Sequence, residues 1–338
     1  MYRIQIIPHL LHFRQPAGTS RGIYTSRQVF YVLVTSVEQP EIWGVGECAP
    51  LPHLSCDDFP QYGDVLAQTC RKIEQTGLTK EATDALRHYP SMLFGLETAF
   101  RQLASESFAL WDSPFSRGEA GIPINGLIWM DSHPQMLRQI EEKLQAGFRC
   151  IKLKIGAINF EDELSLIRHI RKHFPVGDVE IRVDANGAFS PNKALEKLKR
   201  LAEWDIHSIE QPISAGQPEL LSQLTRETPL PVALDEELIG CNTLVGKQQL
   251  LETIQPQYIV LKPSLHGGLQ GCSEWIEAAE RLQIGWWITS ALESNIGLNA
   301  IAQWCATLHS PSCHGLGTGA LFANNTEMPL AVKDARLW

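Results

Sequence analysis

The sequence lacks the cysteine and basic patterns that mark several classes of protein. Its eight cysteines form no C-x-x-C pair and no cluster with histidine at zinc-binding spacing. In a chain of 338 residues we therefore expect reduced thiols and a cytoplasmic protein. No basic run accompanies the net charge of −9, so nucleic acid and anionic membranes are not expected partners.

Long apolar runs are missing as well. Residues 1–8 do not resemble the apolar segment of a signal peptide, and no stretch approaches the ~18 apolar residues that a membrane span needs. No low-complexity segment or linker occurs. The apolar share of 44% and the charged share of 20% are ordinary for a globular protein, and the length allows one domain or two.

The first third of the chain alternates strand and turn before it becomes helical. Strands are predicted where β-branched and aromatic residues gather, at residues 2–7, 28–37 and 42–47. Polar segments rich in Gly and Pro predict a mobile loop at residues 14–22 and a second loop at residues 48–55. Helical patterns follow at residues 58–76 and 91–105. Strands followed by helices indicate a separate α+β unit, which we expect to span residues 1–120.

From residue 122 onward the pattern changes to alternating strand and helix. After a first strand at 122–130, strand starts fall near residues 150, 180, 206, 231, 258 and 285. The intervals carry amphipathic helical stretches, such as residues 134–146, 191–204 and 271–282. Residues 314–319 fit a shortened eighth strand.

Seven or eight such units predict an α/β fold with a (β/α)₈-type barrel over residues 121–319. An open, doubly wound sheet is the alternative, but it would not need eight units, and no G-x-G-x-x-G follows a first strand. The tail, residues 320–338, is expected to pack back on this N-terminal unit and complete it.

Charged residues close successive apolar runs in this second part. They are Lys154, Asp184, Glu210, Asp235 and Lys262. The three acids are separated by 26 and then 25 residues, about the length of one strand-plus-helix unit. Because the carboxyl ends of barrel strands meet at one mouth, we expect these side chains to converge there. A solvated strand edge or ordinary ion pairs are the alternative reading.

Three carboxylates without His or Cys make a hard, oxygen-only site. That donor set suits Mg²⁺, with Mn²⁺ as a possible substitute, and the cation would bind a substrate carboxylate as a Lewis acid. Lys154 and Lys262 are expected on opposite sides of the barrel axis, and Lys152 on the same strand face as Lys154. The predicted chemistry is removal of a proton α to a carboxylate from a small-molecule substrate.

These residues resemble the motifs of the enolase superfamily, in particular its muconate-lactonising subgroup. The matching set is the Lys152-Leu-Lys154 pair, Asp184, Glu210, Asp235 and Lys262. The resemblance covers essentially the whole chain and implies an N-terminal capping domain with two loops over the barrel mouth. Residues 44–50 look like the second of these loops.

Within the subgroup, residues 290–297 and 314–319 are most similar to the o-succinylbenzoate synthases of menaquinone biosynthesis. Hydroxyls on strand seven, Ser290 and Ser294, could bind a substrate carboxylate, and Gly315 and Thr318 on strand eight could approach the substrate closely. Dipeptide epimerases carry an Asp-x-Asp pair there, which is Gly317-Thr318-Gly319 in this chain. The family reaction is dehydration of 2-succinyl-6-hydroxy-2,4-cyclohexadiene-1-carboxylate to o-succinylbenzoate.

The resemblance implies roles for the lysines. Lys154 would abstract the proton and then protonate the departing hydroxyl on the same face, while Lys262 would support the enediolate as a cation. Lys152 would give electrostatic support. An N-acylamino-acid racemase or a dipeptide epimerase would use the same residues, and a non-catalytic barrel that binds a carboxylate is a more distant alternative. The oligomeric state is not predicted.

Smaller signals allow more than one interpretation. Asn186 either contacts the site or only caps a turn. One of Glu236 and Glu237 is expected to hold Lys262 or a metal ligand, with the other solvated. Three histidines, His266, His309 and His314, are read as structural or peripheral. Thr19 and Arg21 could meet the succinyl arm or belong to an unrelated loop, and the Trp286-Trp287 pair predicts packing against barrel helices, with one ring facing outward.

Overall fold

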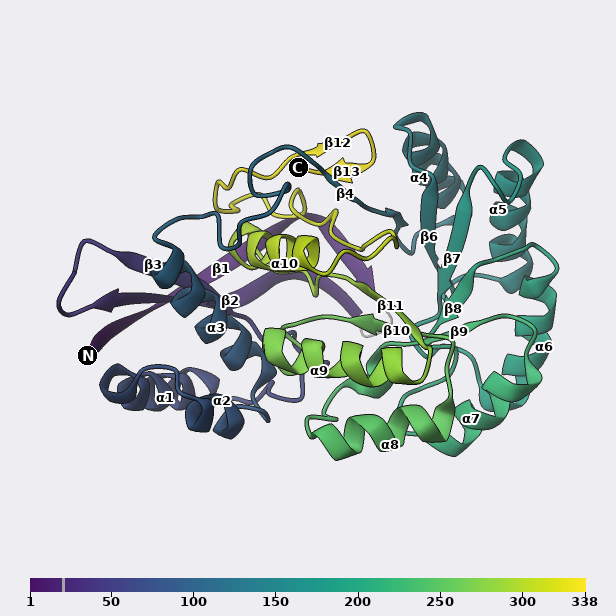
Figure 1. The fold of residues 1–338 in the computed structure, drawn as a ribbon. Coiled ribbons are helices and arrows are strands. Elements are labelled where there is room, and N and C mark those ends of the chain that lie inside the picture. The colour runs from purple at the N-terminus through teal and green to yellow at the C-terminus, as the bar shows by residue number, and fades with distance from the viewer. Residues whose placement is uncertain (20–21) are drawn as a thin grey trace.

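The structure is a computed structural model that describes residues 1–19 and 22–338. Figure 1 shows two parts side by side, an N-terminal unit of strands and helices in purple and blue and a larger α/β part in teal and green. The N-terminal unit contains β1 to β3 and α1 to α3, and the second part begins after α3.

The N-terminal unit is built on an antiparallel sheet in the order β1-β2-β3. Its strands are β1 (Tyr2–Thr19), β2 (Gly22–Ser36) and β3 (Trp43–Cys48). The predicted loop at residues 14–22 is therefore wrong for its described part, because β1 and β2 pair as far as Thr19 and Gly22, across a register shift between His12 and Ala17. The prediction that residues 44–50 form a capping loop is wrong for residues 44–48, which belong to β3 and pair with β2.

Three helices cover one face of this sheet: α1 (Tyr62–Thr76), α2 (Lys80–Ala85) and α3 (Pro90–Ser105). α1 and α3 agree with the predicted helices, except that residues 58–61 lie outside α1, while α2 was not predicted. Their apolar sides pack against β2 and β3 in one buried cluster that includes Val32, Leu66 and Leu96. Side-chain periodicity of about 3.6 residues is enough to predict such a face.

The second part is a curled parallel sheet in the order β11-β10-β9-β8-β7-β6-β5. Its strands are β5 (Gly126–Ile128), β6 (Cys150–Lys154), β7 (Glu180–Asp184), β8 (Ser208–Glu210), β9 (Val232–Leu234), β10 (Tyr258–Leu261) and β11 (Gly285–Ile288). Helices alternate with them along the chain: α4 (His133–Gln145), α5 (Phe160–His173), α6 (Pro191–Ala202), α7 (Pro218–Glu227), α8 (Leu244–Ile254), α9 (Gly268–Arg281) and α10 (Asn295–Thr307). Figure 1 shows these helices around the outside of the strands.

Residues next to the two edge strands of the parallel sheet, β5 and β11, pair with the same short segment. Ile124 forms a parallel bridge with His314, and Thr289 forms one with Gly315. The predicted eighth strand at residues 314–319 is thus reduced to bridges at two residues. This short pairing links the region before β5 to the end of β11.

Alternating side chains give each strand of the parallel sheet two different faces. In β6 and β7 the residues that contact the outer helices are apolar, such as Ile151, Leu153 and Val183, and they join the main buried cluster. The opposite face carries Lys152, Lys154 and Asp184. The polar row therefore points to the inside of the curled sheet.

The C-terminal segment contacts both parts of the molecule. Phe322 bridges Phe13 of β1, and the Arg14 N–H donates to the Leu321 carbonyl at 2.8 Å. Farther on, β12 (Val332–Lys333) and β13 (Arg336–Leu337) form a small sheet with β4 (Ile122–Pro123), in the order β12-β13-β4. The domain boundaries at residues 120 and 320 stay a prediction.

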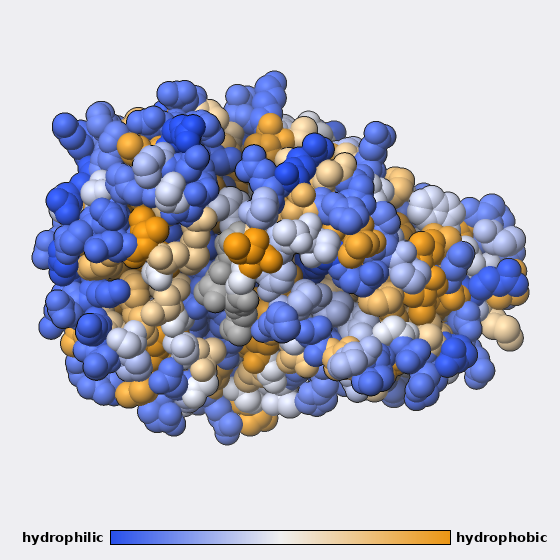
Figure 2. Space-filling view, turned by 180° about the vertical axis from the view of Figure 1, so that it is seen from behind, coloured by the Kyte–Doolittle hydropathy of each residue, from blue (hydrophilic) through white to orange (hydrophobic). Residues whose placement is uncertain are grey.

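The face of the molecule opposite to that of Figure 1 is mostly hydrophilic, with apolar residues scattered among charged ones (Figure 2). No described helix has both the length and the apolar content to cross a lipid bilayer. All eight cysteines are free thiols, as the sequence predicts.

Candidate active site

Three acidic side chains meet at the carboxyl edge of the parallel sheet. Asp184 ends β7, Glu210 ends β8, and Asp235 directly follows β9. Strand register pairs Asp184 with Glu210, so neighbouring strands bring the two carboxylates together. Asp184 and Asp235 are fully buried, and Glu210 is 2% exposed. Burial of three acids in one place is costly unless cations neutralise them.

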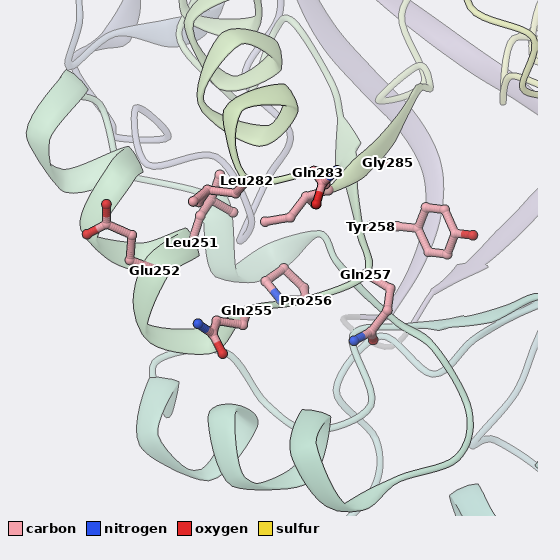
Figure 3. Close-up of a pocket in the computed structure, with 10 residues that line it drawn as sticks. Leu251, Glu252, Gln255, Pro256, Gln257, Tyr258, Leu282, Gln283 and Gly285 are labelled. Atoms are coloured by element: carbon pink, nitrogen blue, oxygen red, sulfur yellow. The ribbon is translucent and has the colours of Figure 1, made fainter.

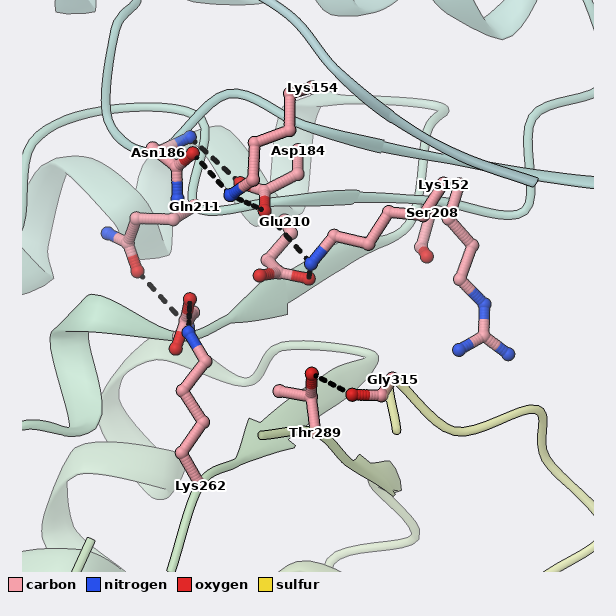
Figure 4. Close-up of polar contacts among 12 residues, drawn as sticks. Lys152, Lys154, Asp184, Asn186, Ser208, Glu210, Gln211, Lys262, Thr289 and Gly315 are labelled. Atoms are coloured by element: carbon pink, nitrogen blue, oxygen red, sulfur yellow. Dashed lines mark hydrogen bonds and ion pairs between the residues drawn. The ribbon is translucent and has the colours of Figure 1, made fainter. Parts of the chain in front are cut away.

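Lysine amines supply positive charge from both sides (Figure 4). Lys152 Nζ lies 2.9 Å from Asp184 Oδ2 and donates to Glu210 Oε2 at 2.6 Å. Lys154 Nζ donates to the same oxygen of Asp184 at 2.9 Å. Lys262, which follows β10, forms an ion pair with Asp235. Figure 4 places Lys154 and Lys262 on opposite sides of the carboxylates, in the arrangement that the strand order predicts.

Burial and charge shift the pKa values of these groups in different directions. Burial would raise the pKa of Asp184, but the amines of Lys152 and Lys154 hold it well below its usual range. Burial, reinforced by the charge of Asp184, raises the pKa of Glu210 to about 8. Burial would lower the pKa of Lys262, but Asp235 and then Glu210 raise it. The lysines thus substitute for part of the positive charge that the acids require.

The acids fit a hard divalent cation by their chemistry. Among the described residues, no group of three or more His, Cys, Asp or Glu side chains is already arranged to hold a metal ion, and the lysines pair with the carboxylates instead. Two buried carboxylate oxygens, Glu210 Oε1 and Asp235 Oδ1, have no hydrogen-bond partner among the described residues. Unpaired carboxylate oxygens in a site without His or Cys are ligands of the kind that Mg²⁺ prefers.

Asn186 contacts the site rather than only capping a turn. Its side-chain oxygen accepts from Lys154 Nζ at 2.7 Å, and its amide nitrogen donates to Glu236 Oε1 at 3.0 Å. Its backbone N–H also donates to Asp184 Oδ1 at 3.0 Å. Asn186 therefore helps to fix the position of the Lys154 amine beside Asp184 and is itself held by Glu236.

The acids after Asp235 are both largely buried, so the expectation that one of them is solvated is wrong. Glu236 is 6% exposed and Glu237 is 9% exposed. Glu237 accepts the Gly216 N–H at 3.1 Å and lies against Gln211, while Glu236 contacts Asn186. A 3-10 turn, η1 (Glu236–Leu238), turns both side chains inward.

The predicted substrate contacts of strands seven and eight fall into two groups. Ser290 and Thr318 lie side by side, with their hydroxyl oxygens 2.7 Å apart. The Gly315 carbonyl accepts from Thr289 Oγ1 at 2.9 Å and from the Ser290 N–H at 3.1 Å. Ser294 is fully buried, and its hydroxyl donates to Glu47 Oε2 at 2.5 Å. Its role in substrate binding stays a prediction.

The histidines and the tryptophan pair have structural surroundings. His266 Nδ1 accepts the Lys262 N–H, and His314 Nδ1 accepts the Ile288 N–H, each at 3.0 Å. Burial lowers the pKa of His314 to about 4, so its ring stays neutral near neutral pH. His309 is exposed.

Trp287 is buried against Ala233 and Val260 of neighbouring strands, and the Arg182 guanidinium lies 4.2 Å from the centre of its ring. Trp286 is only half-buried and contacts Glu280. The two rings thus face opposite sides of β11, with Trp287 on the inside of the curled sheet.

Sequence reasoning missed Gln211, which follows Glu210. Its side-chain oxygen accepts the backbone N–H of Asp235 at 3.3 Å and of Glu237 at 3.1 Å, so it holds the backbone of a predicted metal ligand. Its place directly after Glu210 in the sequence is the signal that could have identified Gln211. Arg21 lies outside the described residues, as does the side chain of Thr19, so the prediction for the succinyl arm is not addressed.

Two cavities lie at opposite ends of the parallel strands. The one at the carboxyl ends has a volume of about 910 Å³ and is lined by His53, Met130, Gly156, Ala157, Asn186, Gly187, Ala188, Gln211, Ser214, Ala215 and Glu236. The other, of about 620 Å³, lies at the starts of β10 and β11, and Tyr258 and Gly285 line it (Figure 3). We place the functional site at the first cavity, because only that one contains predicted site residues.

Comparison with known proteins identifies the family. A model of the enolase C-terminal domain-like family matches residues 135–337. The chain belongs to the enolase superfamily. It is 44% identical to the o-succinylbenzoate synthase of Desulfotalea psychrophila, over 97% of this chain and 96% of that protein. The crystal structure of MenC from the same organism superposes with a TM-score of 0.86 and 38% identity, over 99% of each chain.

Other members of the enolase superfamily are more distant. The L-Ala-D/L-Glu epimerase of Bacillus subtilis is 27% identical over 53% of this chain and 48% of its own length. Its substrate complex superposes with a TM-score of 0.79 at 19% identity, which shows a shared fold alone. The comparisons confirm the predicted superfamily and the prediction that the protein is an enzyme.

Proposed function

We propose that the protein is an o-succinylbenzoate synthase, a hydro-lyase that converts 2-succinyl-6-hydroxy-2,4-cyclohexadiene-1-carboxylate to o-succinylbenzoate in menaquinone biosynthesis. The observation that carries the proposal is the match of 44% identity over 97% of the chain to an o-succinylbenzoate synthase. The buried lysine and carboxylate cluster at the carboxyl edge of the sheet supports it with chemistry suited to a carbon acid.

We further propose that the parallel sheet, together with the bridges at His314 and Gly315, is a (β/α)₈-type barrel closed by a reduced eighth strand. In this proposal residues 1–120 and 320–338 form the capping domain over the barrel mouth. A catalytic site at the carboxyl ends of the strands is the usual arrangement in such barrels. A cytoplasmic location remains part of the proposal.

The proposed cofactor is Mg²⁺, with Mn²⁺ as a substitute, held by Asp184, Glu210 and Asp235. When bound, the cation supplies Lewis-acid stabilisation of negative charge on the substrate carboxylate. Lys152 bridges Asp184 and Glu210 in the structure and holds both acids in place. Its charge favours the ionised form of each acid, and for Glu210 it opposes the rise in pKa that burial causes.

Lys154 is the proposed base. Its amine takes the proton from the carbon next to the carboxylate and then gives a proton to the hydroxyl that leaves as water from the same face. One C–H bond and one C–O bond break, one C=C bond forms, and the lysine is regenerated. Asn186 and Asp184 orient the amine, with N–O distances of 2.7 Å and 2.9 Å. Lys262 remains a cation on the other face and supports the developing negative charge.

The substrate contacts proposed from strands seven and eight are Ser290, Gly315 and Thr318, with Asn186 and Glu236 beside Lys154. A dipeptide epimerase or an N-acylamino-acid racemase is the alternative on the same scaffold. Residues 317–319 carry Gly-Thr-Gly and no acid that would hold a substrate ammonium. We therefore propose a substrate with anionic arms and no amine.

The test is incubation of the purified protein with the cyclohexadiene substrate and Mg²⁺, with product formation followed by chromatography. We expect o-succinylbenzoate, loss of its formation after treatment with a chelator, and recovery with Mg²⁺ or Mn²⁺. Absence of the product with either cation would overturn the proposed function. Product formation that persists in excess chelator would overturn the metal requirement.

A further inference from the structure

A buried carboxylate of the N-terminal unit reaches the barrel. Glu47, in β3, is fully buried. It accepts the Ser294 N–H at 2.9 Å, the Gly297 N–H at 3.0 Å and the Ser294 hydroxyl at 2.5 Å. These donors belong to the start of α10, where free N–H groups and the helix dipole favour an anion. The first turn of a barrel helix is thus held by a side chain from the N-terminal sheet.

Glu47 is not needed merely to cap α10. The Ser294 hydroxyl already accepts the Ile296 N–H at 3.2 Å, which is the ordinary capping bond of a helix. Burying an additional carboxylate is costly, and burial raises the pKa of Glu47 against the opposing effect of Arg27. Gly297 allows this close approach, because a Cβ there would lie 2.8 Å from Glu293 Cβ and 2.9 Å from Glu47 Oε2.

Arg27 of β2 holds the neighbouring part of the same segment. Its guanidinium is 1% exposed and donates to the carbonyl oxygens of Ala291 and Ala49, the latter at 2.5 Å. Arg27 therefore holds the backbone just before residues 292 and 293, and Glu47 holds it just after them.

The segment between these contacts, residues 291–294, has a constrained conformation. Leu292 has a φ of 65°, in the left-handed region that side chains other than glycine rarely adopt. Glu293 is fully buried and accepts the Ala291 N–H at 2.7 Å and the Ser264 hydroxyl at 2.5 Å. Such strained conformations persist where surrounding contacts hold them in place, and they are frequent at functional sites. Ser290, whose hydroxyl meets Thr318, directly precedes this segment.

We propose that Glu47 is a positioning residue that fixes the segment from Ser290 to Gly297, and through it the Ser290 and Thr318 hydroxyls that receive a carboxylate arm of the substrate. The inference rests on the proposed function, because it uses Ser290 as a substrate contact. Glu47 itself does not touch substrate. Its loss weakens binding of the arm while Lys154, on the far side of the site, keeps its own partners.

Glu97 provides a matched control. This carboxylate of α3 accepts the Leu269 N–H at 2.6 Å and the Gln270 N–H at 3.1 Å, in the first turn of α9. It is also a carboxylate from the N-terminal unit on a barrel helix, but it holds the first turn of α9, at the opposite end of that helix from β11 and Ser290. A general effect of loosened packing between the two parts would appear in both variants.

The experiment compares Glu47→Gln, Glu47→Asp and Glu97→Gln with the wild-type enzyme in the Mg²⁺-dependent dehydration assay. For Glu47→Gln we expect KM to rise about tenfold while kcat stays within about twofold, the pattern of lost uniform binding. Glu47→Asp keeps the charge with a shorter reach, so its KM should lie between the two, and it serves as the test if the Gln variant does not fold. Glu97→Gln should keep the wild-type KM.

Amide hydrogen exchange over residues 290–297 gives a readout that is independent of turnover. We expect faster exchange there in Glu47→Gln and wild-type rates in Glu97→Gln. An unchanged KM in both Glu47 variants, or an equal rise in Glu97→Gln, would overturn the inference while leaving the proposed function intact. Absence of product from the wild-type enzyme would overturn the proposed function, and this inference with it.

Discussion

At the scale of single residues, the two lysines that face each other across the carboxylates differ in their surroundings. Lys154 has an ionic partner, Asp184, and a neutral one, Asn186. Lys262 forms an ion pair with Asp235, and its backbone N–H is held by His266. The neutral amide beside Lys154 can accept from the amine without adding negative charge. This difference is compatible with a base at Lys154 and a fixed cation at Lys262.

Two replacements of Lys154 test whether this residue acts as a base or only through its positive charge. We expect Lys154→Ala to lower kcat by roughly 10²–10⁴-fold or more, the usual range for a lost general base. Lys154→Arg keeps the positive charge, but a guanidinium does not lose its proton in proteins, so it should be equally inactive. Steady-state kinetics, with circular dichroism to check folding, measure both. Substantial activity in the Arg variant would show that residue 154 acts only through its charge.

At the scale of elements, close backbone contact joins the N-terminal sheet to α3. Gly46 lies in the middle of β3, and a Cβ built there would come within 1.8 Å of the Gly95 carbonyl oxygen. That neighbour is helix backbone, which cannot rotate away as a side chain can. The same strand carries Glu47, so the spacing of β3 and α3 also sets where Glu47 enters the barrel.

Gly46→Ala should therefore destabilise the fold by roughly 1–3 kcal/mol, as overpacked cores do. Gly177 is the control, because a Cβ there meets nothing within 4 Å and its φ is not in the left-handed region. We expect Gly177→Ala to have a free energy of unfolding equal to or slightly above that of the wild type. Urea denaturation gives both values, and equal stability of the two variants would contradict this account of β3 packing.

A buried acid at the start of α3 makes stability depend on pH. Asp57 is 1% exposed and accepts the Ser91 N–H at 2.9 Å and the Ser91 hydroxyl at 2.6 Å. Burial raises the pKa of Asp57 from 3.8 to about 6. Because the folded state holds the proton more tightly than the unfolded state, this group's contribution to stability falls as the pH rises from about 4 to about 6.

The variant Asp57→Asn cannot titrate. Between pH 4 and pH 6.5 the wild type should lose roughly 2 kcal/mol of unfolding free energy relative to the variant, given about 1.4 kcal/mol per pKa unit. Urea denaturation across this pH range measures the difference. A difference between the two proteins that is constant with pH would contradict the assignment to Asp57.

Several elements and the core of the site could be predicted from the sequence because their signals are local. An apolar run closed by Asp184 or Glu210 predicts both a strand and the end where its charge lies. The long hairpin of β1 and β2 could not be predicted, because residues 14–19 have the polar, Gly- and Pro-containing composition of a loop, yet residues 17–19 pair with β2 beyond a register shift. The use of Ser294 also escaped prediction, since its partner Glu47 is 247 residues away.

At the scale of the whole molecule, charged groups that are partly or fully buried connect the N-terminal unit to the barrel helices. Arg87, after α2, donates to both oxygens of Glu274 on α9, at 2.9 Å and 2.7 Å, and Lys247 of α8 binds the same carboxylate. Glu97 and Glu47 hold the starts of α9 and α10. The barrel strands that precede these helices, β10 and β11, end just before Lys262 and Ser290. The N-terminal unit is therefore fixed to the part of the barrel that would hold the substrate.

The central claim is that this barrel dehydrates a substrate with anionic arms rather than inverting an amino-acid centre. The most direct measurement compares two values of kcat/KM in Mg²⁺, one for o-succinylbenzoate formation from the cyclohexadiene substrate and one for racemisation of N-acylated amino acids. The account predicts that dehydration is the faster reaction by at least about tenfold, since strand eight offers Gly317-Thr318-Gly319 and no acid for an amine. Racemisation without any formation of o-succinylbenzoate would contradict it.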